Sequence, residues 1–246
     1  MLFAIGAGER LVGVSSFDTY PPEVTKIPRV GGLLDPDLER VLALRPDLVI
    51  TYGTQQDLRA QLQRARIETF SYTHGSLADI IITMRALGQR VGLPAGADVA
   101  ARRLEAQLKR VSDRIAGLKR PRTMLIFGRE RGALRGIYAS GGRGFLHDVL
   151  EVAGGDDVFK DIDRESVQVT SELALTRAPE VIIELHPDVQ LDDAAIARER
   201  QVWRPLGSIP AVRNSRIYLL TGPELVLAGP RIGEVAERFA RVLHPE

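Results

Sequence analysis

The sequence predicts an α/β protein of two lobes, each with a central, mostly parallel sheet flanked by helices, joined by one long helix. Two observations predict this fold. A helix–proline–strand segment at residues 37–50 is repeated at 170–183, and residues 95–118 between the copies contain few helix breakers and carry one apolar stripe. We therefore expect an N-terminal lobe at residues 1–94, a connecting helix at 95–118 and a C-terminal lobe at 119–246.

The repeat keeps a constant offset. In each copy a glutamate follows a capping residue, a proline stands seven positions later, and an acidic residue and three aliphatic residues follow the proline. Glu172 lies 133 positions after Glu39, and Pro179 lies 133 positions after Pro46. A glutamate in a first helical turn stabilises any helix, but nothing in a helix requires it at the same distance from the same proline twice.

Each copy is typical of a short helix that runs into a buried strand. Asp37, and Thr170 or Ser171, can accept hydrogen bonds from the free amides of the first turn. Each proline ends its helix and favours an extended conformation for the residue before it. Residues 48–50 and 181–183 are continuously apolar, which predicts parallel strands covered on both faces.

The remaining elements follow from breakers and periodicity. In the first lobe we expect a strand at 11–14, loops at 15–22 and 28–36, a helix at 55–65, a strand at 68–72 and a helix at 76–91. In the second we expect strands at 123–127, 136–139 and 216–220, and helices at 145–152, 191–200 and 229–243.

The start of the chain is unusual. Residues 1–8 are typical of the last turn of a helix that ends at a glycine, with no strand before it to begin a βα unit. We expect a natural N-terminal segment, with an export signal, to precede Met1, and whether the mature protein carries a lipid anchor stays open. No apolar run approaches the 18 residues that would indicate a membrane-spanning helix.

Composition excludes several classes of function. A content of 44% hydrophobic residues in 246 suffices for sizeable cores, and 33 basic against 32 acidic residues leave a net charge of +1. That balance provides no field to recruit nucleic acid or an anionic membrane. Cysteine is absent, which excludes disulfides, thiolate metal sites and a cysteine nucleophile.

The sequence provides little support for catalysis, a metal site or a cofactor. None of His74, His147, His186 and His244 has metal-ligand spacing, and no nucleophile elbow or marked carboxylate pair is present. The glycines of residues 141–144 enter a helix but lack the Lys-Ser/Thr of a P-loop, which favours a tight strand-to-helix turn.

Segments over nearly the whole chain resemble the substrate-binding proteins of ABC importers that have a rigid helical spine between two lobes, the class III periplasmic binding proteins. Among these the chain is similar to the cobalamin (vitamin B12) and iron-siderophore type. Singly each segment is common, and together they are specific. The segments are 12–16, 20–22, 38–50, 145–146, 150–155, 158–161, 171–172, 209–212 and 229–232.

The resemblance implies a carrier that does no chemistry. In that family two glutamates dock the lobes on arginines of the dimeric membrane permease, and the matching positions are Glu39 and Glu172. It also implies a periplasmic or otherwise extracytoplasmic location, a small metal-chelate ligand bound between the lobes, and no nucleic acid partner. We expect a monomer.

The resemblance places the ligand against side chains of strand-end loops. Aromatic residues suit a corrin because a flat macrocycle offers much apolar area, worth about 25 cal/mol per Å² buried. Trp203, the one tryptophan, is expected to pack in the core instead. The contacts would be Phe17 and Tyr20 in the first loop, Leu33 in the second, Tyr52 after its strand, Tyr138 in the second lobe and Ser166 in the loop before Glu172.

Two alternatives stay open beside the corrinoid. A haem or ferric siderophore would need anion contacts, for which the sequence offers Arg129, Arg131, Arg135 and Arg143. Tyr52, Tyr138 or His186 could then serve as an axial ligand to haem iron. Outside the class, an α/β enzyme could use the same cleft.

Overall fold

The computed structural model describes residues 1–73 and 75–245, which form two compact units. Unit 1 contains the described residues up to 73 together with 81–102, and unit 2 contains 75–80 and those from 103 onward. Helix α4 (Pro94–Arg114) contributes residues to both units and ends four residues before the end expected for it. Within the described ranges, no helix combines the length and the apolar character needed to cross a bilayer.

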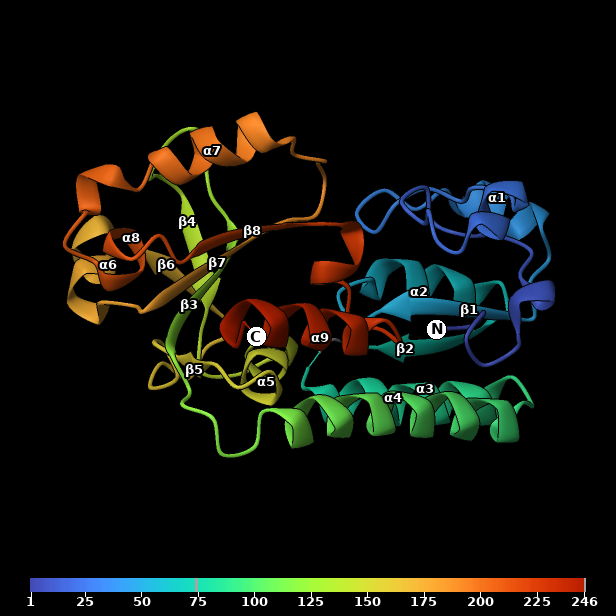
Figure 1. Cartoon of the computed structure of the whole chain (residues 1–246). Helices are drawn as coiled ribbons and strands as arrows, with labels where there is room; N and C mark the ends of the chain where they lie inside the picture. The colour runs from blue at the N-terminus through green and yellow to red at the C-terminus, as the bar shows by residue number, and fades with distance from the viewer. Residues whose placement is uncertain (74, 246) are drawn as a thin grey trace. The chain divides into compact units, whose positions relative to one another are not determined.

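Unit 1 is built on a two-stranded parallel sheet (Figure 1). Strands β1 (Leu48–Tyr52) and β2 (Glu68–Tyr72) run in register, with Tyr52 opposite Tyr72 at their C-terminal ends. Three helices of this unit are expected from the sequence and present, with shifts of one or two residues at their ends. They are α1 (Leu38–Ala43), α2 (Gln56–Arg64) and α3 (Leu77–Arg90), the last of which begins in unit 2.

Alternate residues of β1 enter two different apolar clusters. Val49 packs with Val41 of α1 and Leu62 of α2, whereas Ile50 packs with Leu87 of α3 and Ala97 of α4. Both faces of the small sheet are therefore covered, as the apolar run predicts. Burial is nevertheless incomplete, since residues 48–50 are all of intermediate exposure.

The segment before α1 is mostly irregular. The amide of Ala7 donates to the Leu2 carbonyl at 2.9 Å, and Gly6 has φ +87°, which confirms the expected helix-type ending at a glycine. The strand expected at residues 11–14 is wrong, because Val14 makes only an isolated bridge to Arg29. Two short 3-10 helices interrupt the loops, η1 (Gly8–Arg10) and η2 (Pro22–Lys26).

Unit 2 contains a six-stranded mixed sheet whose main strand order is β6-β4-β3-β7-β8 (Figure 1). The pairs β3–β7 and β7–β8 are parallel, whereas β4 pairs antiparallel with both β3 and β6. Strands β5 and β6 were not expected from the sequence. The strands are β3 (Arg122–Gly128), β4 (Ile137–Ser140), β5 (Asp156–Asp157), β6 (Ser166–Val169), β7 (Val181–His186) and β8 (Ile217–Thr221).

Helices and one large core complete unit 2. Trp203 and Phe159 are fully buried in a cluster with side chains of β3, β4, β6, β7 and β8, which confirms Trp203 as a packing residue. The helices are α5 (Phe145–Val152), α6 (Ser171–Arg177), α7 (Asp193–Gln201), α8 (Pro210–Arg213) and α9 (Ile232–Leu243), with short 3-10 helices η3 (Arg204–Leu206) and η4 (Pro223–Val226).

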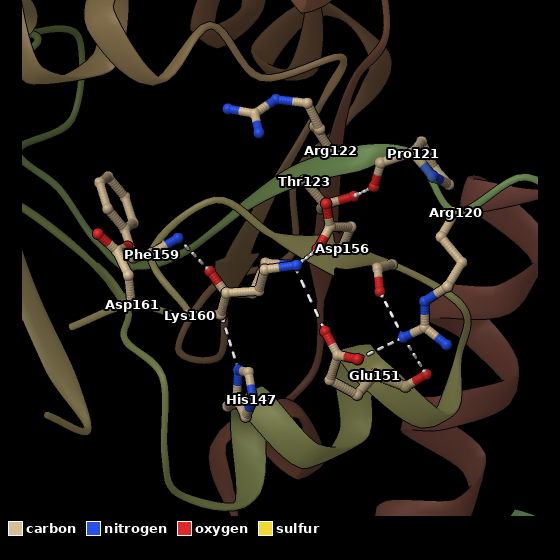
Figure 2. A network of polar contacts seen from close by, with 12 residues as sticks. Arg120, Pro121, Arg122, Thr123, His147, Glu151, Asp156, Phe159, Lys160 and Asp161 are labelled. Atoms are coloured by element: carbon tan, nitrogen blue, oxygen red, sulfur yellow. Dashed lines mark hydrogen bonds and ion pairs between the residues drawn. The ribbon is translucent and has the colours of Figure 1, made fainter. Parts of the chain in front are cut away.

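A polar network joins α5 to the adjoining strands of unit 2 (Figure 2). Arg120 donates to the Glu151 carboxylate at 2.5 Å and to the Gly155 carbonyl at 2.7 Å, so it closes the C-terminal end of α5. His147 contacts the buried Asp157 at 3.1 Å, and Asp157 accepts the Phe159 amide at 2.9 Å. Two segments that carry the family resemblance, 150–155 and 158–161, therefore have a structural role.

Candidate functional site

Glu39 stands in the first turn of α1 with its carboxylate exposed. The Asp37 side chain caps the helix by accepting the Arg40 amide at 3.0 Å, as the sequence predicts. The Arg40 guanidinium also contacts Asp37, at 3.0 Å, and so does not neutralise Glu39. Over residues 1–73 and 75–245, the Glu39 side chain makes no ion pair or hydrogen bond.

Glu172 occupies the equivalent place in α6. Here Thr170 is the cap, since its hydroxyl accepts the Leu173 amide at 3.2 Å. The basic residue at the end of α6, Arg177, contacts Asp161 at 2.9 Å. Glu172 is exposed, and in the part of the chain that the structure describes its carboxylate has no partner. Each unit thus presents one uncompensated carboxylate from the start of a short helix.

Both helices end in a way that differs from the prediction. The residues before the two prolines are not extended but left-handed, with φ 48° at Arg45 and 45° at Ala178. In this conformation the amide of Ala178 donates to the Ala174 carbonyl at 3.0 Å and that of Arg45 to the Leu42 carbonyl at 3.1 Å. These hydrogen bonds close the last turn before the proline prevents continuation.

The first loop of unit 1 projects aromatic side chains into solvent. Phe17 is 79% exposed and Tyr20 is exposed as well. The loop itself is fixed, because Arg29 donates to the carbonyls of Ser15 and Asp18 at 2.8 and 2.6 Å. An apolar ring held out by an anchored backbone is available to a ligand without reorganisation of the loop.

The second loop of unit 1 approaches the first at Gly32. A side-chain carbon at this glycine would lie 2.8 Å from the Phe17 ring, so only glycine allows the ring to rest there. The neighbouring Leu33 is exposed, and its carbonyl accepts the Gln55 amide group at 3.0 Å. Gln55 also accepts the Tyr52 backbone amide at 3.0 Å, which connects the loop to the end of β1.

Tyr52 is the last residue of β1 rather than the first residue after it, which corrects the expected position. Its ring meets the Tyr72 ring edge to face, with centroids 5.5 Å apart and planes at 75°. Tyr72 was missed from the sequence, although its place at the end of the next strand could have indicated it. Burial, followed by the charge of Asp18 and by Tyr52, raises the pKa of Tyr72, so its phenol stays protonated.

Three of the four predicted contacts of unit 1 therefore gather at one edge of its sheet, and the fourth, Tyr20, belongs to the first loop. Phe17, Leu33 and Tyr52 are linked through Gly32 and Gln55, and Tyr72 joins them from β2. This edge is the carboxyl end of both parallel strands, the usual place for ligands in α/β sheets.

In unit 2 the two predicted contacts share one face of the β4–β6 pair. Ser166 is the first residue of β6 and not part of a loop, which corrects its expected position. Tyr138 lies opposite Gln168 and Ser140 opposite Ser166, and directly opposed residues point to the same side of a sheet. Tyr138 and Ser166 are both exposed, whereas Val167 and Val169 point into the core.

Arg129 is not an anion-contact residue, contrary to the prediction. Its side chain is only 3% exposed and contacts Glu184 at 2.7 Å and Glu199 at 2.8 Å. It also donates to the carbonyls of Glu130 and Ala133, which commits all five N–H groups. The sequence could not show this, because both carboxylates come from more than 50 residues further along the chain.

The other three arginines lie on the surface of unit 2. Arg135 contacts Glu130 at 3.0 Å, and Arg143 is 3.8 Å from Asp163. Arg131 is exposed and, within the described residues, has no ion pair. All three side chains reach solvent, and their role toward an anionic ligand stays a prediction.

The three described histidines have separate surroundings. His147 contacts Asp157, and His186 contacts Glu184 at 3.2 Å. Burial lowers the pKa of His244 and favours its neutral form. His74 lies outside the described residues. Among those that are described, no three metal-ligating side chains come together.

The glycine run entering α5 is a turn, as the sequence favours. The amide of Gly142 donates to the Ile162 carbonyl at 2.8 Å, and that of Gly141 to the Glu165 carbonyl at 3.3 Å. A side-chain carbon at Gly142 would lie 2.2 Å from the Lys160 carbonyl oxygen. These amides are therefore committed to the backbone and do not point at a phosphate.

An open groove of about 690 Å³ lies elsewhere on unit 1, along α2 and the start of β2. Arg59, Arg66 and Arg90 line it together with Gln56 and Gln63. Arg90 forms an ion pair with Glu68, and Arg59 donates to the Ser71 hydroxyl at 2.7 Å. The groove contains none of the predicted ligand contacts.

Comparison with known proteins identifies the family of this chain. A family model described as periplasmic binding protein matches residues 1–224. The vitamin B12-binding protein of Salmonella typhimurium is 32% identical over 232 residues, which cover 93% of this chain and 84% of that protein.

Solved structures show the same fold. The periplasmic vitamin B12 binding protein of Vibrio cholerae superposes with a TM-score of 0.80 at 24% identity, over 98% of this chain and 91% of that one. A periplasmic heme binding protein from Pseudomonas aeruginosa gives 0.84 at 24% identity, over 100% and 88%. The chain belongs to the periplasmic binding protein family.

Proposed function

We propose that this protein is the extracytoplasmic substrate-binding component of an ABC importer and that its ligand is a corrinoid such as cobalamin. The observation that carries the proposal is the 32% identity to a vitamin B12-binding protein over 93% of the chain. The similar proteins are substrate-binding proteins rather than enzymes, and we propose capture and delivery of the ligand as a monomer, without catalysis.

The site at the carboxyl edge of β1 and β2 suits a corrin chemically. Phe17 offers a largely exposed ring, and Leu33 adds apolar surface. Each 100 Å² of such surface covered by the ligand is worth about 2.5 kcal/mol before the cost of association. Tyr52 and Tyr72 add aromatic rings at the same edge. In unit 2, Tyr138 and Ser166 are the proposed contacts.

Delivery would use the two uncompensated carboxylates. Glu39 and Glu172 stand at equivalent places of a repeated element, one in each unit, and neither is neutralised within the described chain. Such a pair fits the arginines of a two-fold symmetric permease, because each half of the partner would meet the same charge.

A haem ligand is the second candidate. The observation in its favour is the fold similarity to a heme binding protein together with exposed Arg131, Arg135 and Arg143. Tyr138 is exposed on the same unit and offers a phenolate for iron. In unit 1 the raised pKa of Tyr72 disfavours the phenolate form there.

The experiment is a retention assay with three chromophores. The protein is incubated separately with cyanocobalamin, hemin and a ferric siderophore, desalted, and scanned for absorbance. We expect cyanocobalamin to be retained at one equivalent, and Phe17→Ala to weaken its binding roughly tenfold. Leu118→Ala, an exposed apolar residue outside the site, is the matched control. Retention of hemin alone would reject the corrinoid.

The docking role is tested separately. Charge reversal of both glutamates, Glu39→Arg with Glu172→Arg, should abolish transport into vesicles that contain the permease and leave cyanocobalamin affinity unchanged. A variant that loses ligand affinity while it still docks would contradict the roles assigned to these residues.

A further inference from the structure

A second pair of residues repeats at the offset of the glutamates. Leu175 lies 133 positions after Leu42, and each leucine stands three residues after the glutamate of its own copy. Both are exposed to nearly the same extent, Leu42 to 38% and Leu175 to 39%. Two large apolar side chains are thus half in solvent at equivalent places of two different units.

Helix geometry places each leucine beside its glutamate. Residues three apart on an α-helix are neighbours on one face, one turn from each other. The residue directly before each leucine points the opposite way, since Val41 is 6% exposed and Ala174 is fully buried. Glutamate and leucine therefore share the outer face of α1 and of α6.

The next exposed position of each helix carries a small residue in both copies. Ala43 and Thr176 follow the leucines, stand four residues after the glutamates, and are exposed. A small residue at this place leaves room for a partner side chain to reach the carboxylate and the leucine together. The surface of each helix thus consists of an acid, a leucine and a small residue in the same order.

Packing within each unit does not account for the exposed part of the two leucines. A single exposed leucine is ordinary on a protein surface. Two that recur beside the same acid at the same offset are not required by either helix, because a polar residue would serve at a position that is more than one third exposed. Arg40 and Arg177 are held by Asp37 and Asp161, so the outer faces keep their negative charge.

We propose that each docking surface is a two-part contact, formed by Glu39 with Leu42 in unit 1 and by Glu172 with Leu175 in unit 2. The partner must then present, on each of two equivalent surfaces, a basic side chain bordered by an apolar pocket. The leucine enters the pocket and excludes water from the neighbouring ion pair, which strengthens that pair. This inference rests on the proposed function, in which the partner is the two-fold symmetric permease.

The test measures binding to the purified permease of this transport system in lipid nanodiscs. Leu42→Ala and Leu175→Ala should each weaken docking about three- to tenfold, and the double variant by roughly the product. Leu118→Ala, 49% exposed and outside the repeat, is the control and should dock like the unmodified protein. Cyanocobalamin affinity and the thermal midpoint should not change in any of the four variants.

The outcomes separate this inference from the proposed function. If charge reversal of both glutamates abolishes docking while the double leucine variant docks normally, the leucine contact is overturned and the carrier function stands. If Leu118→Ala weakens docking as much as the repeat variants, the contact is not confined to the repeat and the inference also fails. If the unmodified protein does not dock at all, both proposals are rejected. Leu42→Gln with Leu175→Gln, which keeps side-chain size, should weaken docking as much as the alanine pair.

Discussion

The two copies of the helix–strand repeat share their local structure but not their surroundings. Both helices begin at a side-chain cap, expose a glutamate and a leucine, and end at a left-handed residue before proline. Their strands then differ. β7 lies between β3 and β8 and is buried at five of its six positions. Among the described residues, β1 pairs only with β2, and it is buried only at Thr51. The same local pattern therefore gives different burial, because neighbouring strands decide it.

The contrast is strongest at one pair of equivalent positions. Thr51 of β1 and Glu184 of β7 are 133 positions apart, and both are buried. Glu184 accepts hydrogen bonds from Arg129 and Trp203, the latter at 2.5 Å, and contacts His186. The Thr51 hydroxyl has no partner among the residues described. At this pair of equivalent positions, the buried side chain of β7 is hydrogen-bonded, and that of β1 is not bonded within the described ranges.

The largest effect should follow from breaking the network at Glu184. Arg129→Met removes the cation that contacts the buried Glu184 and the partly buried Glu199, and we expect it to lower the free energy of unfolding of unit 2 by about 3–5 kcal/mol. Urea unfolding followed by Trp203, the single tryptophan, measures this. The control is Arg135→Met, which breaks an exposed pair and should cost less than about 1 kcal/mol. Equal effects would show that the network does not stabilise unit 2.

The same network predicts a pH dependence. Burial alone would raise the pKa of Glu184, but hydrogen bonds from His186, Arg129 and Trp203 and the Arg129 charge outweigh it and lower the pKa below its ordinary value. A carboxyl with a lowered folded pKa contributes stability that is present above the unfolded pKa and is lost as pH falls through the folded one. The urea midpoint should therefore fall on acidification below about pH 4.3, the ordinary glutamate pKa.

Two variants test whether Glu184 causes this fall of the urea midpoint at low pH. Glu184→Gln should flatten the acid limb of the midpoint curve. Asp157→Asn should make the acid limb steeper. Burial raises the pKa of Asp157, so the stability that this residue contributes is present at low pH and is lost as pH rises. An unchanged acid limb in Glu184→Gln would assign the slope to other carboxyls.

The sequence predicted those helices and strands that are marked by residues close together in the chain. Caps, prolines and apolar periodicity placed α1, α5, α6 and β2 within a residue or two, and they placed the start of β7. Strand β6 was missed because it alternates over only four residues, and residues 11–14 form no strand because no neighbour pairs with them beyond the bridge at Val14. Elements defined by partners far along the chain are the ones that local patterns miss.

The same distinction applies to the residues of the candidate site. The equivalent, exposed places of Glu39 and Glu172 were predictable because the repeat marks them, and their docking role stays a prediction. Tyr72 was missed because only the register of β1 against β2 brings it to Tyr52. Arg129 was misjudged because its carboxylates come from β7 and α7, and nothing near it in the sequence indicates that it is buried.

A smaller effect on stability, of the same size in both units, should follow from substitution of the left-handed residues before the two prolines. A side chain in this conformation costs roughly 1 kcal/mol, which glycine does not incur. Arg45→Gly and Ala178→Gly should therefore each stabilise their own unit by about 0.5–1 kcal/mol. Hydrogen exchange of α1 and Trp203 fluorescence report on the two units. Ala106→Gly, exposed in the middle of α4, is the control and should destabilise by about 1 kcal/mol.

The smallest effect should come from Thr51→Val, which tests the buried threonine of unit 1. Valine keeps the shape and removes a buried hydroxyl that lacks a partner in the described chain, so we expect a gain of about 0.5 kcal/mol, seen as slower hydrogen exchange in β1. Thr123→Val is the matched control in unit 2, since the Thr123 hydroxyl is equally buried but donates to the Pro121 carbonyl at 2.8 Å. That substitution should cost about 1 kcal/mol. Opposite signs would show that a buried threonine stabilises only where it is bonded, whereas a loss in both would mean that the Thr51 hydroxyl has a partner in solution.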